Sequence, residues 1–326
     1  MKNVLIIGGG GYVGSQLVPD LLKLEYKVDV YDLFIYGQDV FDNSPNLKLI
    51  KGDIRNIKKL SEIIKDYDAV IHLACISNDP SFELNPKLGK SINLDCFRPL
   101  VEICKINKVK RFIYASSSSV YGIKKEKNVS EDLLLEPLTD YSKFKVECEK
   151  ILFEYKDEQF ETVIIRPATV CGYARRQRLD VVVNILTNLA FNNRKIKILG
   201  GEQLRPNIHI KDMSRIYIKT LESDKVLVNG EIFNAGYDNM SVNEIGSAVQ
   251  KIVGKDVKIE REETNDNRSY HISSEKIKKN LNFEPKFSVE DAIIDLKKAF
   301  EENKLPNSLK DSIYFNIKKM QEIDLK

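Results

Sequence analysis

The chain has 326 residues, of which 30% are charged and 42% are hydrophobic, a composition typical of a globular protein. Its 51 basic and 48 acidic residues leave a net charge of +3, which does not favour nucleic acid as a partner. No apolar run approaches the ~20 residues needed to cross a bilayer, and no export signal opens the chain, so we expect a cytoplasmic protein without membrane contact. The five cysteines form no C-x-x-C pair and the three histidines lie far apart, so we expect reduced thiols and no metal site.

Short apolar runs alternate with helical patterns in the first half of the chain. Several of the runs are nearly continuous in apolar residues, as expected for strands covered on both faces. The runs lie at 3–7, 27–31, 47–50, 69–74, 111–115 and 162–166. The helical patterns lie between them, at 13–24, 57–66, 88–107 and 141–157. Repeated β-α units predict an α/β fold with a Rossmann-like, doubly wound parallel sheet, whose ligand binds at the carboxyl ends of the strands.

The alternation loosens beyond residue 167. Helices are expected at 180–192, 211–222 and within 242–300, and short strands at 196–199, 231–234 and 257–260. We predict a Rossmann domain at 1–170, to which 207–236 returns, and a smaller, mostly helical lobe made of 171–206 and 237–326. The lysine-rich C-terminal end suggests no role.

Glycines at positions 8, 11 and 14 join the first expected strand to the first expected helix. Glycine is needed where the chain turns sharply, where backbone approaches a diphosphate and where a helix packs closely on a strand. The free N–H groups and the positive end of the helix then face the anion. We therefore expect a dinucleotide to contact Gly8, Gly11, Tyr12, Val13 and Gly14.

Asp32 ends the second expected strand, at the distance from the glycines that a dinucleotide site requires. An acid at this place accepts hydrogen bonds from both hydroxyls of the adenosine ribose and repels a 2′-phosphate. The cofactor is therefore expected to be NAD(H) rather than NADP(H). Asp53 follows the third strand and is placed to reach the adenine edge.

A tyrosine and a lysine four residues apart can supply the base for nicotinamide chemistry on an alcohol. The phenol pKa must fall from ~10 toward neutrality, and an ammonium one helical turn away favours this electrostatically. Of three Tyr-x-x-x-Lys matches, Tyr121/Lys125 has a glycine directly after the tyrosine and Tyr314/Lys318 lies outside the sheet pattern. Tyr141/Lys145 opens a strong helix after the fifth strand, which itself ends in serines 116–119. This pair is therefore the predicted one.

Taken together, these motifs resemble those of the extended short-chain dehydrogenase/reductases that modify nucleotide sugars. The resemblance covers nearly the whole chain and also rests on Asp53-Ile54, His72-Leu73-Ala74, Asn93, the Ser117…Tyr121-Gly122 run, Arg166-Pro167 and Arg205-Pro206…His209. It implies that Tyr141 deprotonates a sugar hydroxyl, normally at C4. Lys145 would lower the pKa of Tyr141 and hold the nicotinamide ribose, and Ser117 would bind the reacting oxygen.

The resemblance also implies further binding residues. Asn93 would organise the cofactor site, and Arg205 and Arg268 would grip the nucleotide diphosphate with bidentate guanidinium geometry. Asn184 either contacts the diphosphate or is a partly exposed polar residue of its helix, and the Arg175–Arg178 cluster is either an anion contact or a solvated loop. The remaining expected contacts are Ile54, Leu73, Ala74, Ser116 and Pro167 for the cofactor and Ser118 for the substrate.

Two departures from the family pattern bear on the reaction. Dehydratases carry Thr-Asp-Glu or similar where this chain has Ser117-Ser118-Ser119, and serine cannot replace the acid and base of water elimination, so 4,6-dehydration is disfavoured. The sequence after the sixth strand, Arg166-Pro167-Ala168-Thr169-Val170, differs from that of the familiar galactose epimerases. It is similar to branches that act on hexoses or heptoses of surface polysaccharides, a GDP-linked heptose being one candidate.

Several alternatives remain open at this point. The expected 4-keto sugar is either reduced again on its other face, which is 4-epimerisation, or released, which is C4 dehydrogenation. A non-catalytic NAD(H)-binding regulator on the same fold is the alternative of a different class. Family members often form homodimers through the helices equivalent to 88–107 and 141–157, and the apolar stripe of the second helix suits either that contact or packing on its own sheet.

Overall fold

The computed structural model describes residues 1–126, 128–264, 269 and 271–326. Seven parallel strands form the main sheet in the order β10-β6-β5-β4-β1-β2-β3. Their bounds are β1 (Asn3–Ile7), β2 (Lys27–Asp32), β3 (Leu47–Lys51), β4 (Ala69–His72), β5 (Arg111–Ala115), β6 (Glu161–Pro167) and β10 (Glu231–Ala235). The strand order reverses beside β1, so the crevice for a ligand lies at the carboxyl ends of β1 and β4. The predicted doubly wound sheet is confirmed.

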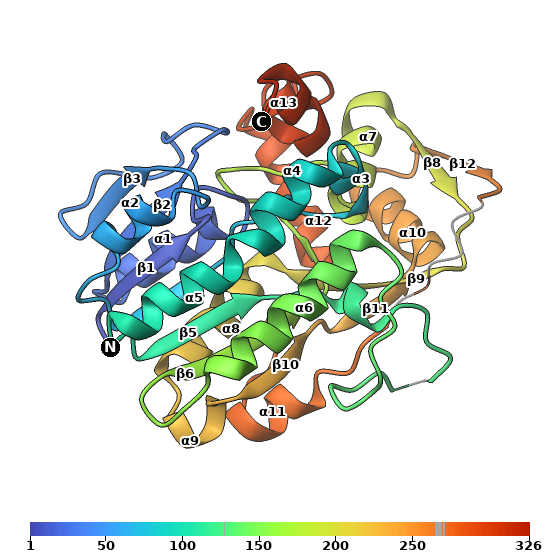
Figure 1. Cartoon of the computed structure of the whole chain (residues 1–326). Coiled ribbons are helices and arrows are strands. Elements are labelled where there is room, and N and C mark those ends of the chain that lie inside the picture. The colour runs from blue at the N-terminus through green and yellow to red at the C-terminus, as the bar shows by residue number, and fades with distance from the viewer. Residues whose placement is uncertain (127, 265–268, 270) are drawn as a thin grey trace.

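Helices cover both faces of this sheet (Figure 1). One face carries α1 (Gly14–Lys23) and α8 (Ile210–Glu222), which pack against each other, and the other carries α2 (Ile57–Ile63), α5 (Phe97–Ile106) and α6 (Asp140–Tyr155). Alternate residues of β1 face the two layers, Val4 and Ile6 toward α1 and Leu5 and Ile7 toward α5. Burial on both faces explains the continuous apolar runs of the sequence.

The stretch expected as one helix at 88–107 is divided in the structure. It contains α4 (Pro86–Lys90), a π-helical turn η1 (Ser91–Asp95) and α5. Pro99 lacks the N–H that would bond to the Asp95 carbonyl in a regular helix, which is a physical reason for the interruption. The π-turn places Asn93 inside the fold, facing the loop after β4.

The C-terminal lobe contains two small sheets as well as helices, so it is mixed rather than mostly helical. A three-stranded sheet joins β7 (Thr169–Cys171), β9 (Leu204–His209) and β11 (Asp238–Ser241), and a two-stranded sheet joins β8 (Lys195–Leu199) and β12 (Lys258–Glu262). The polar residues and proline of β9 and β11 hide the apolar alternation by which strands are recognised. A core shared by α7 (Val182–Asn193), α10 (Val242–Val253) and α12 (Val289–Glu301) packs behind these sheets.

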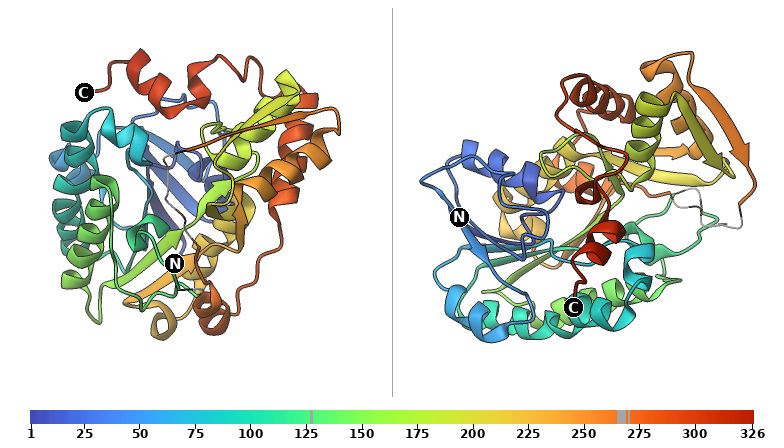
Figure 2. Two further views of the ribbon diagram at one scale, coloured as in Figure 1. Left: turned by 90° about the vertical axis from the view of Figure 1, so that its right-hand side faces the viewer. Right: turned by 90° about the horizontal axis from the view of Figure 1, so that it is seen from above.

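Short elements complete the chain: α3 (Asp79–Glu83), η2 (Ser118–Tyr121), α9 (Lys225–Val228), α11 (Glu275–Leu281), η3 (Ser312–Tyr314) and α13 (Asn316–Glu322). The return of β10 to β6, and of α8 to α1, brings residues beyond 207 back to the main sheet. The assignment of 1–170 and the lobe to cofactor and substrate remains a prediction. The last segment, with η3 and α13, runs from the lobe back toward the main sheet (Figure 2, right).

The apolar stripe of α6 is largely used within this chain. Cys148, Ile151 and Leu152 are buried between α6 and the sheet, while Phe144 and Tyr155 are only partly buried. Dimerisation through this helix and 88–107 remains a prediction. None of the described helices is long and apolar enough to span a membrane.

Candidate active site

A cavity of about 590 Å³ opens at the carboxyl ends of β1, β4 and β5. Most of the residues singled out from the sequence line it: Gly8, Gly11, Tyr12, Val13, Gly14, Asp32, Asp53, Ile54, Leu73, Ala74, Ser116, Ser117, Ser118, Tyr141, Lys145, Pro167 and Arg205. Asn93 and Asn184 are not part of the lining. Arg268 lies outside the described residues.

The glycine turn after β1 forms one wall of the cavity. Gly8 has φ of +83°, and a Cβ there would lie 2.3 Å from the Ala74 nitrogen. A Cβ at Gly14 would lie 2.1 Å from the Gly9 carbonyl oxygen, so α1 packs backbone against backbone on the turn. At Gly11 a Cβ would meet only the Gly8 oxygen, at 3.3 Å, so the folded chain does not by itself demand a glycine there. Glycine at this position suits the close approach of a diphosphate.

Asp32 joins the end of β2 to the glycine turn. Its Oδ2 accepts from the Gly10 N–H at 3.0 Å and its Oδ1 from the Phe34 N–H at 2.6 Å. Burial raises the pKa of this carboxyl, against these hydrogen bonds and the charge of Arg176. Asp53 pairs with Arg55, whose guanidinium Nη2 lies 2.6 Å from Oδ2; this pair outweighs burial and lowers the pKa of Asp53. A carboxylate at each of these two strand ends fits the adenosine half of NAD.

Tyr141 and Lys145 come from the first turns of α6, which begins at a capping box of Thr139 and Ser142. Tyr141 is 9% exposed and Lys145 is 4% exposed. The Lys145 ammonium donates to the Ala115 carbonyl at 2.6 Å and lies 5.8 Å from the centre of the Tyr141 ring. Ser117 Oγ lies 2.8 Å from Ser119 Oγ. The phenol, the ammonium and the serine hydroxyls therefore line one cavity.

The electrostatics around Tyr141 act in two directions. Burial raises the pKa of the phenol above its ordinary value, and Cys75 and Asp79 raise it further. The charge of Arg178 and an interaction with the Ser117 hydroxyl act to lower it. The expected lowering of this pKa by Lys145 remains a prediction.

His72 in β4 is buried. Burial, together with the nearby Lys145 ammonium, lowers the pKa of His72 to about 3.

Two predicted residues are engaged by the protein itself. Asn93 is buried; its Oδ1 accepts from the Ile76 N–H at 2.8 Å, and its Nδ2 donates to the Ile76 carbonyl at 2.9 Å. It thereby holds the loop after β4 that lines the cavity. The side chain of Asn184 is fully buried, accepts from the Gly172 N–H and donates to the Tyr12 hydroxyl and the Arg178 carbonyl. Asn184 thus supports the cavity wall from behind.

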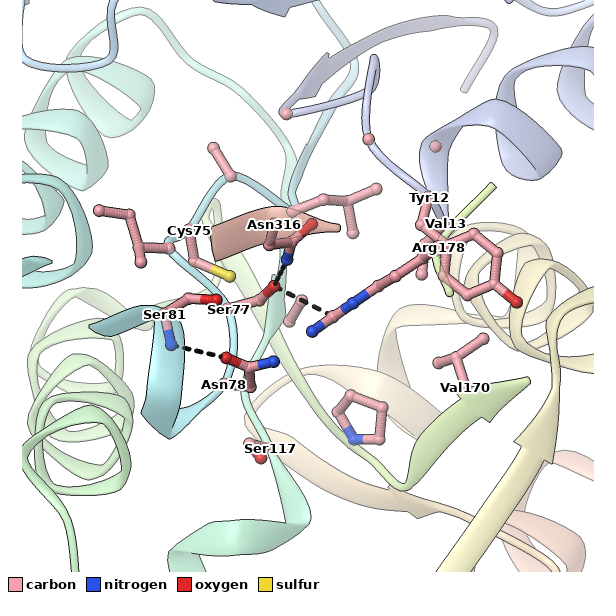
Figure 3. Close-up of a pocket in the computed structure, with 18 of the residues that line it drawn as sticks. Tyr12, Val13, Cys75, Ser77, Asn78, Ser81, Ser117, Val170, Arg178 and Asn316 are labelled. Carbon is pink, nitrogen blue, oxygen red and sulfur yellow. Dashed lines mark hydrogen bonds between the residues drawn. The ribbon is translucent and has the colours of Figure 1, made fainter. Parts of the chain in front are cut away.

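Residues to which the sequence assigned no definite role also line the cavity. In the 175–178 cluster, Arg175 is an exposed residue paired with Asp42, whereas Arg176 and Arg178 face the cavity. Ser77 and Asn316 meet at its centre, with Arg178 directed toward them (Figure 3). The density of arginines was the only signal in the sequence, since nothing marks Ser77 or Asn316.

The two rejected tyrosine–lysine matches lie outside the cavity lining. The Tyr121 hydroxyl donates to Asn234 Oδ1 at 2.7 Å and accepts from Arg166 Nη1 at 2.8 Å, inside the core. The Tyr314 hydroxyl donates to the Pro306 carbonyl. Only Tyr141 combines the motif with a place at the cavity.

Comparison with known proteins agrees with this geometry. The family model described as "NAD dependent epimerase/dehydratase family" matches residues 4–236. A UDP-glucose 4-epimerase of Lactobacillus helveticus is 27% identical over 276 residues, which are 78% of this chain and 82% of the relative. A dTDP-D-glucose 4,6-dehydratase of Dictyostelium discoideum is 29% identical over 263 residues, 73% of this chain and 59% of the relative.

Among solved structures, the UDP-N-acetylglucosamine 4-epimerase of Methanobrevibacter ruminantium M1, in complex with UDP-N-acetylmuramic acid, is 26% identical with a TM-score of 0.83. The match covers 93% of this chain and 99% of that structure. The glycine cradle and Asp32 are the features that NAD requires. The chain therefore belongs to the NAD-dependent epimerase/dehydratase family, the extended short-chain dehydrogenase/reductases of nucleotide sugars, and its cofactor is NAD.

Proposed function

We propose that the chain oxidises the C4 hydroxyl of a nucleotide sugar, with Tyr141 as the base. One observation carries this proposal: Tyr141, Lys145 and Ser117 line the same cavity as the glycine turn and Asp32. A base for the alcohol and a cradle for the dinucleotide thus share one space. The sequence departures and the names of the relatives support a sugar nucleotide as the substrate class.

Each residue has a definite task in this reaction. Tyr141 accepts the hydroxyl proton, and Ser117 donates a hydrogen bond to the reacting oxygen. Lys145 is held by the Ala115 carbonyl one helical turn from Tyr141 and favours the phenolate by its charge. The glycine turn and Asp32 would hold NAD, which would supply the hydride acceptor for C4. Tyr141 is largely buried, at 9% exposed, and the lower local dielectric strengthens these electrostatic interactions.

The nucleotide end of the substrate is assigned to Arg205 and Arg268. Arg205 lies on β9 and lines the cavity, and its Nη1 donates to the Leu204 carbonyl at 3.0 Å. We propose that Arg205 grips the diphosphate, while the assignment of Arg268 rests on the sequence alone. Arg205→Ala is expected to raise the KM for the sugar nucleotide and to leave NAD affinity unchanged; loss of NAD instead would contradict the assignment.

Water elimination is not part of the proposal. Ser118 and Ser119 occupy the positions where a dehydratase needs an acid. The hydroxyl and the backbone N–H of Ser119 are both hydrogen-bonded to the Ser117 hydroxyl. The carboxylates of the cavity are engaged elsewhere: Asp32 by backbone N–H groups, Asp53 by Arg55, Asp180 by Arg178 and Asp79 by Thr139. No serine hydroxyl can protonate a leaving hydroxide near neutral pH.

The fate of the 4-keto sugar is tested by the mass of the product. The purified protein is incubated with GDP-, UDP- and dTDP-linked hexoses and heptoses and examined by mass spectrometry and NADH absorbance. A 4-epimerase returns a product of unchanged mass, and a C4 dehydrogenase returns one lighter by two hydrogens with formation of NADH. A product lighter by one water would overturn the exclusion of water elimination. The absence of turnover with every sugar while NAD stays bound would overturn the proposal, because that result supports a regulator.

A further inference from the structure

The C-terminal segment, from η3 to Lys326, forms part of the cavity wall. Asn316, Met320 and Leu325 line the cavity, and Met320 and Leu325 pack on the hydrophobic cluster of α5 and α6. The Lys326 carbonyl accepts from Arg55 Nη2 at 2.6 Å, beside Asp53. The segment crosses from the lobe to the main sheet at this place (Figure 2, right). A stretch without a recognisable motif therefore lies where the dinucleotide is expected.

Asn316 connects three parts of the chain across the cavity. Its Nδ2 donates to Ser77 Oγ at 3.1 Å, on the loop after β4 (Figure 3). Its Oδ1 accepts from the Tyr36 hydroxyl at 2.9 Å and from Arg176 Nη2 at 2.7 Å, and its backbone N–H donates to Asp180 Oδ2 at 2.9 Å. Three of these four bonds use the donor and acceptor capacity of the side chain, and the fourth comes from the backbone.

Arg176 is a buried cation without a carboxylate partner among the described residues. It is 4% exposed, and its guanidinium carbon lies 3.5 Å from the centre of the Tyr36 ring. Its Nε is buried and has no hydrogen-bond partner. Burial lowers the pKa of this guanidinium and outweighs the favourable charge of Asp180, which reflects the cost of burying the cation. An anionic ligand would offset that cost.

The place of Arg176 indicates which anion this is. Its backbone N–H donates to Ser15 Oγ at 3.2 Å, in the first turn of α1, so the residue lies over the glycine turn. No side chain caps that end of the ten-residue helix α1 within the described chain. Arg178, the neighbouring arginine, differs because it is paired with Asp180. This arginine, which forms no ion pair, thus lies beside a helix N-terminus that already favours phosphate.

We propose that Arg176 is a ligand of the diphosphate of NAD, beside the α1 N-terminus, and that Asn316 is the positioning residue that holds Arg176 there. The C-terminal segment thereby completes the cofactor site. This inference concerns cofactor binding alone, so its test does not depend on the reaction at C4.

The test compares ligands with and without phosphate on three variants. Affinity for NADH is measured by fluorescence, and affinities for ADP-ribose and adenosine by competition. Arg176→Gln is expected to weaken NADH and ADP-ribose binding by about tenfold or more, since a hydrogen bond to a charged group is worth at least that factor. Asn316→Ala is expected to change both in the same direction by a smaller factor. Adenosine affinity stays within about twofold of wild type, because it lacks the phosphates.

The matched control is Gln321→Ala, which removes an exposed amide from the same helix, α13, and is expected to leave all three affinities unchanged. Arg176→Lys keeps the charge without the planar fork and is expected to give an intermediate ADP-ribose affinity, which also serves if Arg176→Gln does not fold. Equal losses for adenosine and ADP-ribose would show a merely structural role and overturn the proposal. The proposal would also be overturned if ADP-ribose affinity were unchanged both in Asn316→Ala and in one of the two Arg176 variants.

Discussion

The two sides of the cofactor cavity are built by different means. The glycine turn and α1 form a floor that packs backbone against backbone, so that a single methyl group at Gly14 would collide with the Gly9 carbonyl. The rest of the wall, which we call the cover, is formed by 172–181 and the C-terminal segment. It is joined by side-chain hydrogen bonds that converge on Asn316. Such bonds are worth about 1 kcal/mol each in the net. The floor is therefore fixed by backbone packing, whereas the cover depends on individual side-chain hydrogen bonds.

The largest expected effect is the loss of chemistry in Tyr141→Phe. The variant keeps the floor and the cover but lacks the oxygen that accepts the proton, so kcat is expected to fall by at least about a hundredfold. NADH affinity, measured by fluorescence, is expected to stay close to that of the wild type. The control is Tyr314→Phe, which alters the unused motif in the C-terminal segment. Turnover retained in Tyr141→Phe would show that the proton goes elsewhere.

The floor is tested by a pair of glycine substitutions. Gly14→Ala places a Cβ 2.1 Å from the Gly9 oxygen and is expected to destabilise the chain by about 2 kcal/mol or more, measured by urea unfolding. Gly11→Ala meets only an oxygen at 3.3 Å, so the free energy of unfolding is expected to change by less than about 1 kcal/mol. NADH affinity is expected to fall in both variants. If Gly11→Ala bound NADH normally, the diphosphate would not pass over this turn.

A smaller effect is expected at the other end of the sheet, at Asp68. Its Oδ2 accepts from the N–H groups of Lys2 and Asn3, and its Oδ1 from Lys110 Nζ. Burial acts to raise the pKa of this carboxyl, but these bonds outweigh it and lower the pKa to about 2. A lowered folded-state pKa contributes stability above the unfolded value of 3.8, and this stability is lost as the pH falls through about 2.

Asp68→Asn is therefore expected to lower the free energy of unfolding at neutral pH by up to about 2 kcal/mol. The difference from wild type is expected to vanish near pH 2, and NADH affinity is expected to be unchanged because the residue is remote from the cavity. Urea unfolding at a series of pH values measures this. A difference that stays constant with pH would mean that the carboxylate is not the titrating group.

The floor could be predicted from the sequence because its parts are local. The glycines, Asp32 and the Tyr141/Lys145 pair each follow a strand, and a parallel sheet gathers strand ends at one edge. A motif that follows a strand can therefore be assigned to this edge without knowledge of contacts between distant parts of the chain. The match at Tyr121 could be set aside for a local reason as well, since its glycine neighbour does not suit a helix.

The cover could not be predicted, because its contacts join distant parts of the chain. Asn316 meets Arg176 across 140 residues and Ser77 across 239, and neither pairing leaves a local pattern. The same limit explains Asn184, whose place in a helix does not reveal that it faces Tyr12. It also explains why β9 and β11 were not expected. These strands pair with each other by backbone hydrogen bonds, and their sequences lack the apolar alternation by which strands are recognised.

The proposal that the chain takes hydride from C4 is tested most directly with a sugar nucleotide deuterated at that carbon. The substrate is the one found active in the product assay, and both the cofactor and the sugar are recovered after a single turnover and examined by mass spectrometry. The expected result is deuterium in NADH if the keto sugar is released, deuterium retained at C4 of the epimer if the keto sugar is reduced again, and neither labelled product from Tyr141→Phe. Unlabelled NADH, or label lost to water, would contradict it.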